Sequence, residues 1–153
     1  MKKLERISAI EAIQQIKARY CRGVDSSDGD LVKSILAEDC VLDYMGCCTD
    51  PVSGIDFFPA MNVILRGRDS WTSNGMSGLG IVSVHQSYNL ELEFSSDTTA
   101  KGIWSMTDRL WFPSGSQFSL MTGYGHYHET YEQVESVWLL KTTRISRIRV
   151  ETC

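Results

Sequence analysis

A histidine stands near the start of a strand-like stretch, IVSVHQSYNLELEFSSD, which covers residues 81–97. The residues around His85 are β-formers, and apolar and polar positions alternate downstream of it. An imidazole titrates near neutral pH, so it can take and return a proton if a pocket exposes it. A histidine packed in the core and bonded to a backbone carbonyl is the alternative. Its role depends on a partner elsewhere in the chain.

The acidic candidate is Asp25, which follows an apolar helical stripe and lies five residues after Tyr20. A carboxylate is slightly unfavourable at the C-terminus of a helix, because the helix dipole is negative there. That small cost hints at a role other than ending the helix. From this residue alone, a solvated side chain is the simpler interpretation.

Two further histidines, His126 and His128, lie in the segment GYGHYHETY. Residues two apart in a strand face the same side, so this pair could bind a metal with His85 as a third ligand. No acidic residue stands at a spacing that completes such a site, and we expect no metal. A substrate-facing or surface pair is the preferred interpretation.

A basic cluster, KTTRISRIR, lies near the end of the sequence. We expect Arg147 and Arg149 on a solvated strand face or in ion pairs at an oligomer interface. The five cysteines are odd in number and show no CxxC spacing, which fits neither a zinc site nor a disulfide framework. They are interpreted as reduced thiols that mostly fill space.

The chain has 153 residues and 42% hydrophobic content, which is typical of one globular domain. A net charge of -4 argues against a general nucleic-acid binder, which would show a basic field. No apolar segment follows the N-terminal lysines as in a secretory signal, and no run approaches the roughly 18 residues of a membrane span. We expect a cytoplasmic protein that binds neither nucleic acid nor membrane.

Hydrophobic periodicity predicts the elements that must position these residues. Strands as long as those expected here must twist and curl. An irregular segment over residues 46–62 could be a lid or a loop at a cavity mouth. Helices are expected at residues 7–24, 31–39 and 67–74, and strands at 40–45, 83–94, 98–112, 117–134 and 137–151.

These elements predict one α+β domain over residues 1–153. Its N-terminal helices would pack in the concave face of a curved, mainly antiparallel sheet, forming a cone-shaped α+β barrel. So few helices cannot cover both faces of four long strands that carry Trp104, Trp111 and Trp138. We therefore expect a homodimer or homotrimer.

This order of elements resembles the nuclear transport factor 2-like fold, and in particular its SnoaL-like branch. The strings that carry the resemblance are AIQQIKARYCRGVDSSD, LAEDCVLDY, RGRDSW, AKGIWSMTDRLWF, GYGHYHETYE and VWLLKTTRISRIRVE. Together they cover nearly the whole chain. The branch includes scytalone dehydratase, bile acid 7α-dehydratase and hexachlorocyclohexane dehydrochlorinase.

The resemblance implies a catalytic pair, because Asp25 and His85 match the positions of an aspartate and a histidine in those enzymes. Asp25 would fix the imidazole tautomer and favour its protonated form, leaving the other ring nitrogen of His85 as the base. Tyr20 and Tyr44 match two tyrosines that could hydrogen-bond a substrate carbonyl, although packing as ordinary aromatics is as plausible. Arg144 falls near the position of a cavity arginine in related lyases.

The sequence and the resemblance together favour a cofactor-independent lyase that dehydrates a small apolar ring-containing compound next to a carbonyl. A ketosteroid-isomerase-like proton-transfer isomerase needs the same groups. A non-catalytic subunit or binding scaffold, such as the small subunit of a ring-hydroxylating dioxygenase, is the alternative in which Asp25 and His85 would lie apart. Candidate substrate-binding residues are Trp104, Met106, Tyr124, His126 and Arg144.

Overall fold

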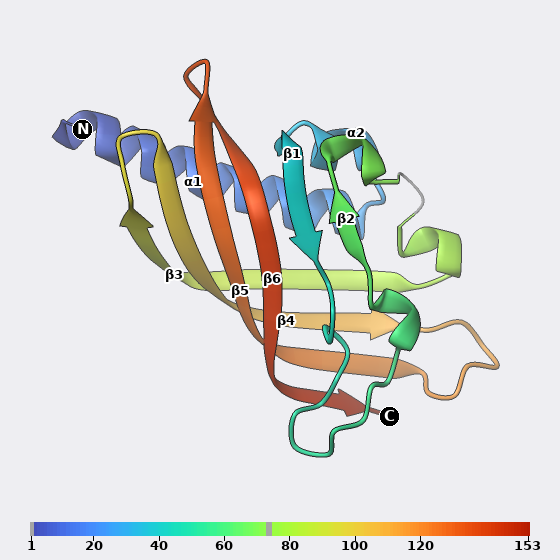
Figure 1. Cartoon of the computed structure of the whole chain (residues 1–153). Coiled ribbons are helices and arrows are strands. Elements are labelled where there is room, and N and C mark those ends of the chain that lie inside the picture. Colours follow the sequence, from blue (N-terminus) through green and yellow to red (C-terminus); the bar gives the residue numbers. More distant parts are fainter. Residues whose placement is uncertain (1, 73–74) are drawn as a thin grey trace.

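The computed structural model describes residues 2–72 and 75–153. Within them, one curved sheet of six strands, in the order β2-β1-β6-β5-β4-β3, carries helix α1 across its concave side (Figure 1). Neighbouring strands are antiparallel except β1 and β6, which are parallel. The sheet does not close, so the expected α+β cone is confirmed as an open one. The elements are α1 (Lys3–Asp25), α2 (Gly29–Lys33), β1 (Leu36–Asp43), η1 (Pro59–Met61), β2 (Ile64–Arg66), η2 (Arg68–Ser70), η3 (Ser77–Leu79), β3 (Val82–Phe94), β4 (Thr99–Trp111), β5 (Leu120–Val134) and β6 (Val137–Thr152).

Helix α1 buries one stripe because its apolar residues recur every three or four positions. The stripe agrees with the predicted one and includes Ala9, Ile13, Ile16 and Tyr20. The helix begins four residues before the predicted start and ends at Asp25. Its end lies against β3, which brings the Asp25 carboxylate to the start of that strand.

The second helix is shorter than the periodicity indicates. Asp28 caps α2 by accepting a hydrogen bond of 3.0 Å from the backbone N–H of Leu31. Residues 36–39, predicted as helix, instead begin β1. Leu36 is fully buried and pairs with Leu140 of β6, so pairing with a distant strand outweighs the local helical pattern.

Two other segments depart from the sequence prediction. Strand β2 pairs with β1 within a region for which no strand was expected. The helix predicted over residues 67–74 is reduced to the short turn η2, and its last two positions lie outside the described residues. The irregular segment 46–62 contains one 3₁₀ turn, η1, and a single bridge between Thr49 and Asp56.

The direction of each side chain on the long strands follows strict alternation in β4 and β5. Even-numbered residues of β4 and odd-numbered residues of β5 face the concave side. In β6 the alternation changes twice, because two bulges each add one residue opposite β5. The buried side chains of β6 therefore lie at an even-numbered position at Leu140, at an odd-numbered one at Ile145 and at an even-numbered one again at Val150.

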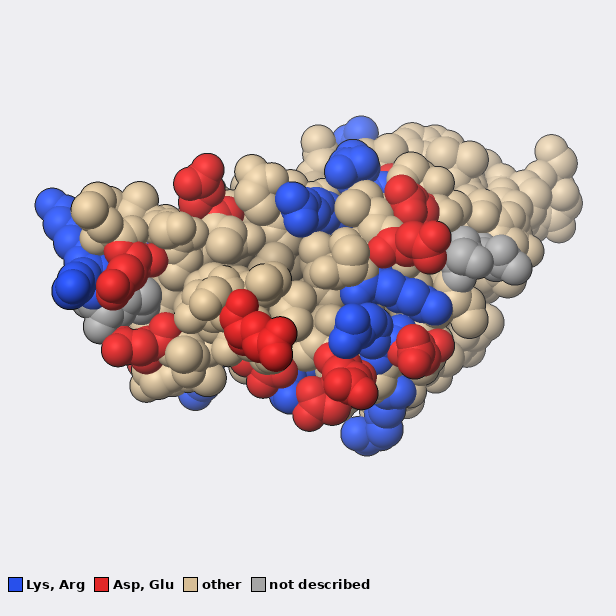
Figure 2. All heavy atoms as spheres, turned by 90° about the horizontal axis from the view of Figure 1, so that it is seen from above, with Lys and Arg blue, Asp and Glu red and all other residues tan. Residues whose placement is uncertain are grey.

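The outer face of the sheet is less aromatic than the sequence suggested. Trp104 and Trp138 point inward and are 6% and 7% exposed, whereas Trp111 is 39% exposed. A homodimer or homotrimer stays a prediction. On the face shown in Figure 2, acidic and basic side chains lie close together and no field of one sign forms. None of the helices in the described residues is long and apolar enough to cross a membrane.

Candidate active site

Asp25 and His85 form a hydrogen-bonded pair at the junction of α1 and β3. The His85 Nδ1 lies 2.6 Å from Asp25 Oδ1. The other carboxylate oxygen accepts the backbone N–H of His85 at 2.8 Å, and the Ser83 hydroxyl donates to Oδ1 at 2.9 Å. Three bonds thus fix the carboxylate, and the carboxylate fixes the ring. A neutral His85 then carries its proton on Nδ1, which leaves Nε2 unprotonated.

A second charged pair lies on the other side of the imidazole. The Asp108 carboxylate, on β4, is 3.9 Å from His85 Nε2. Arg147, on β6, donates two parallel hydrogen bonds to Asp108, of 3.0 Å and 2.7 Å. Gly123 lies between these two strands, and a Cβ atom there would overlap both side chains of the pair. The glycine therefore leaves the space in which the pair sits.

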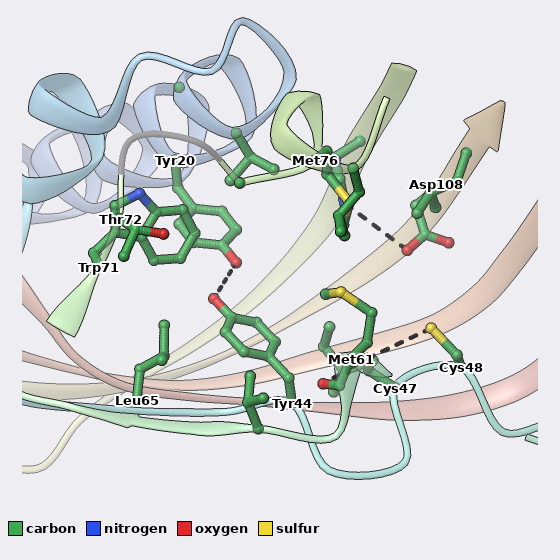
Figure 3. Close-up of a pocket in the computed structure, with 18 of the residues that line it drawn as sticks. Tyr20, Tyr44, Cys47, Cys48, Met61, Leu65, Trp71, Thr72, Met76 and Asp108 are labelled. Carbon is green, nitrogen blue, oxygen red and sulfur yellow. Dashed lines mark hydrogen bonds and ion pairs between the residues drawn. The ribbon is translucent and has the colours of Figure 1, made fainter. Parts of the chain in front are cut away.

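Two tyrosine hydroxyls meet within the same site. Tyr20 from α1 and Tyr44, just after β1, have their hydroxyl oxygens 2.6 Å apart (Figure 3). Burial raises the pKa of both phenols, so both stay protonated. One hydroxyl donates to the other, and the remaining hydrogen is available to a ligand oxygen.

Five of these side chains line a cavity of about 270 Å³ between α1, the sheet and residues 61–72 and 75–79: Tyr20, Tyr44, His85, Asp108 and Arg147. The volume is near the lower end of ligand pockets, roughly 300–1,000 Å³, and suits a small compound. Most of the remaining wall is apolar. The wall includes Val24, Met61, Val63, Leu65, Trp71, Met76, Leu79, Leu110, Met121, Tyr127 and Ile145.

The candidate residues from the sequence fall into three groups. Asp25, His85, Tyr20 and Tyr44 come together as the resemblance implied. Trp104 and Met106 face the concave side, where Met106 contacts Arg147, but neither lines the cavity. The other three, Tyr124, His126 and Arg144, lie on the outer face of the sheet, because the alternation of β5 and the bulges of β6 turn them away.

The charged residues that sequence reasoning missed are Asp108 and Arg147. Arg147, expected on a solvated face or in an interface, is instead buried, with its side chain only 4% exposed. Arg149 is partly exposed and pairs with Asp50 and Glu151 of the same chain. A signal for Asp108 was present: it stands two residues after Met106 and two before Leu110, on the apolar face of a strand.

The outer-face histidines do not complete a metal site within the described residues. His128 bonds to the Ser146 hydroxyl at 2.8 Å, and its ring centroid is 6.4 Å from that of His126. In residues 2–72 and 75–153, no three His, Cys, Asp or Glu side chains are grouped as metal ligands.

A second buried charge cluster lies deeper in the concave face. Lys17 donates to Glu129 at 2.7 Å, and Glu129 also accepts from Thr143 at 3.1 Å and from the Tyr131 hydroxyl. The Trp104 indole donates to Tyr131 at 2.9 Å. We call Lys17, Glu129, Tyr131, Trp104 and Thr143 the closed cluster, and Asp25, His85, Asp108 and Arg147 the open cluster.

The fold and the site define a class: a nuclear transport factor 2-like cone with a histidine–carboxylate pair beside an apolar cavity. The SnoaL-like domain matches residues 5–144. The chain belongs to this SnoaL-like family.

Individual relatives agree with that assignment. The chain is 26% identical over 149 residues to "Probable cyclase FGR4" of Gibberella zeae, covering 92% of this chain and 91% of the relative. Hexachlorocyclohexane dehydrochlorinase LinA-type3 of Novosphingobium barchaimii superposes with a TM-score of 0.78 at 20% identity, over 99% of this chain and 94% of the other. A "Putative Scytalone Dehydratase" of Novosphingobium aromaticivorans gives 0.76 at 18% identity, over 99% and 92%. At such identities the two structures show the fold alone.

Proposed function

We propose that the protein is a cofactor-independent lyase that removes water from a small, apolar, ring-containing compound at the position next to a carbonyl. One observation carries the proposal: His85 is held by Asp25 at 2.6 Å through Nδ1, and the imidazole lines the apolar cavity. The names of the relatives, a cyclase, a dehydrochlorinase and a dehydratase, support chemistry of this kind.

The proposed reaction begins with removal of a proton next to the carbonyl. The free tyrosine hydroxyl hydrogen binds the carbonyl oxygen and stabilises the enolate as charge develops on it. Nε2 of His85 takes the proton, and Asp25 stabilises the resulting imidazolium through the Nδ1–H bond. The enolate then expels the β-hydroxyl, which leaves as water after receiving the proton from Nε2.

The open cluster places one negative and one positive side chain near the imidazole of His85 during this cycle. Asp108 is close enough to Nε2 to stabilise the protonated ring between the two proton transfers. Arg147 neutralises Asp108 and holds it by two hydrogen bonds, so the carboxylate keeps its orientation. Asp108 and Arg147 are therefore proposed as positioning residues around His85.

The test is a panel of cyclic β-hydroxy ketones and β-hydroxy thioesters, with the products analysed by mass spectrometry. Loss of one water identifies dehydration, whereas a product of unchanged mass identifies the isomerase alternative. With an active substrate, His85→Gln should lower turnover by roughly 10²–10⁴-fold, the usual contribution of general acid–base catalysis. Asp25→Asn should act in the same direction, and the two losses should be far from additive.

A matched control is available on the outer face. His126→Gln makes the same chemical change away from the cavity and should leave turnover unaltered. Thermal unfolding of His85→Gln should remain close to that of the parent protein. If this variant instead lost stability while the folded fraction kept full activity, His85 would be a structural residue and the proposed function would fail.

A further inference from the structure

Two adjacent cysteines, Cys47 and Cys48, line the same cavity as His85 and take no part in the proposed reaction. Their sulfur atoms are 3.7 Å apart, within hydrogen-bonding distance for thiols, and Figure 3 shows the pair beside Met61. Each residue is only 3% exposed. Because both line the cavity, we expect a reagent to reach them through it.

The backbone around the two cysteines is fixed by hydrogen bonds on every side. The Cys47 N–H donates to the Tyr44 carbonyl at 3.1 Å, and the Cys47 carbonyl accepts from Arg147 Nε at 2.5 Å. The Cys48 carbonyl accepts the Phe57 N–H at 3.1 Å. The thiols are thus held in place, which lowers the entropic cost of placing a ligand against them.

The surroundings shift the pKa values of the two thiols in opposite directions. The Cys48 S–H can donate to the Cys47 sulfur and, together with the Arg147 charge, lowers the pKa of Cys47 despite burial. The same hydrogen bond, together with burial, raises the pKa of Cys48. The Cys47 S–H can itself donate to the Met61 carbonyl at 3.9 Å, which leaves the Cys47 sulfur to accept from the Cys48 S–H. We therefore infer that Cys47 is the nucleophile and Cys48 its hydrogen-bond donor.

We propose that Cys47 and Cys48 form a covalent binding site for small, uncharged α,β-unsaturated carbonyl compounds. A thiolate is a soft nucleophile and prefers the conjugated β-carbon of such a compound to the harder carbonyl carbon. The apolar wall excludes charged or bulky electrophiles. Tyr20 and Tyr44 line the same cavity, and their hydroxyl pair offers a hydrogen to the carbonyl oxygen of such a compound.

The covalent step balances without an oxidant or a cofactor. The Cys47 thiol first loses its proton to water. The thiolate sulfur then bonds to the β-carbon, and the alkene electrons move to form an enolate whose oxygen the tyrosine hydroxyl stabilises. The enolate then takes a proton from water at its α-carbon. The net change is addition of S–H across the double bond, and it reverses by the same path.

The probe is 2-cyclohexen-1-one, applied at pH 7 to the full-length protein carrying Cys153→Ala, which removes the exposed thiol. Intact mass and peptide mapping should find one adduct per chain, on Cys47. Cys47→Ala should abolish it. Cys48→Ala should keep the adduct on Cys47 but slow its formation severalfold, since losing the donor raises the pKa of the Cys47 thiol.

Two further experiments distinguish binding in the cavity from the ordinary reactivity of an accessible thiol. A maleimide bearing a polyethylene glycol chain should spare Cys47 in the folded protein and label it in urea. Labelling needs no turnover, so His85→Gln should be labelled like the parent whether or not the proposed dehydration is correct. Cys47→Ser and thermal unfolding check that the variants fold.

Three results would overturn the proposal. The adduct could form on Cys21 alone, Cys47 and Cys48 could react at equal rates, or Cys47 could react no faster in the folded protein than in the unfolded chain. Any of them would leave the cysteines as buried packing residues.

Discussion

The open cluster and the closed cluster bury charges on the same concave face but in different surroundings. In the closed cluster, Lys17 and Glu129 are 3% and 0% exposed through their side chains, and Lys17 Nζ lies 3.1 Å from the centroid of the Tyr127 ring. In the open cluster, Asp108 and Arg147 are as deeply buried but line a cavity. Tyr127 contacts Lys17 and also lines that cavity, so it stands between the two clusters.

The difference indicates what each cluster is for. Every polar side-chain atom of the closed cluster is bonded to another side chain of the same cluster, so its charges hold elements together. In the open cluster, Nε2 of His85 has no partner closer than Asp108 at 3.9 Å in the described residues. A polar atom that faces a space rather than a partner is available to a ligand.

The largest contrast should come from removing one charge from each cluster. Glu129→Gln leaves Lys17 buried without a counter-charge and should lower the free energy of unfolding by about 3–5 kcal/mol. Asp108→Asn should cost only about 1–2 kcal/mol, because water in the cavity can solvate Arg147. Urea denaturation of both variants measures the two losses. Equal losses would show that the cavity does not solvate Arg147. The two clusters would then not differ in how they tolerate the loss of a charge.

Only part of the difference between the two clusters could be predicted from the sequence. Helix α1, the long strands and the Asp25–His85 contact could be predicted, because periodicity and element order depend on local pattern. Asp108 and Glu129 both interrupt the apolar face of a strand, and strict alternation could have identified them. Arg147 could not be assigned in this way, since two bulges in β6 shift the alternation and no local pattern marks them.

A smaller effect is expected from Arg147→Lys. A lysine keeps the charge but cannot make the two parallel hydrogen bonds to Asp108. Turnover in the proposed reaction should fall about 10²-fold, as expected when a group beside the reacting atoms is misplaced, with little change in unfolding. Arg149→Lys is the matched control on a partly exposed side chain. If Arg147→Lys left kcat/KM unchanged, Arg147 would contribute to packing alone.

Gly123→Ala should disturb the open cluster by steric overlap. The added methyl group meets both Asp108 and Arg147, and the strain should lower the free energy of unfolding by about 1–3 kcal/mol. Gly75→Ala is the comparison, because a Cβ atom there meets nothing within 4 Å. Thermal unfolding of the pair measures the difference. Similar melting temperatures would mean that Arg147 moves aside without cost.

The last effect concerns pH and applies to buried tyrosines beside the cavity and in the closed cluster. Burial raises the pKa values of Tyr20 and Tyr44 beside the cavity and of Tyr131 in the closed cluster. Above about pH 10 the unfolded tyrosines lose protons that the folded ones keep, so stability is complete below pH 10 and falls as pH rises. Each tyrosine contributes up to about 1.4 kcal/mol per pH unit.

Denaturation between pH 8 and 11 tests that dependence. Tyr44→Phe and Tyr131→Phe should each reduce the decline above pH 10 by the contribution of one tyrosine. If neither substitution changed the fall in stability above pH 10, other groups would cause the pH dependence.

The parallel pairing of β1 with β6 has a consequence for the order in which the protein can fold. Leu36 pairs with Leu140, so roughly 100 residues must be added after β1 leaves the ribosome before its partner exists. At about 5–20 residues per second, the edge of β1 that pairs with β6 stays unpaired for about 5–20 s. The turn at Glu135 and Ser136, both with positive φ, allows β5 and β6 to form a hairpin immediately. Synthesis of β6 is therefore the step that ends the exposure of this edge.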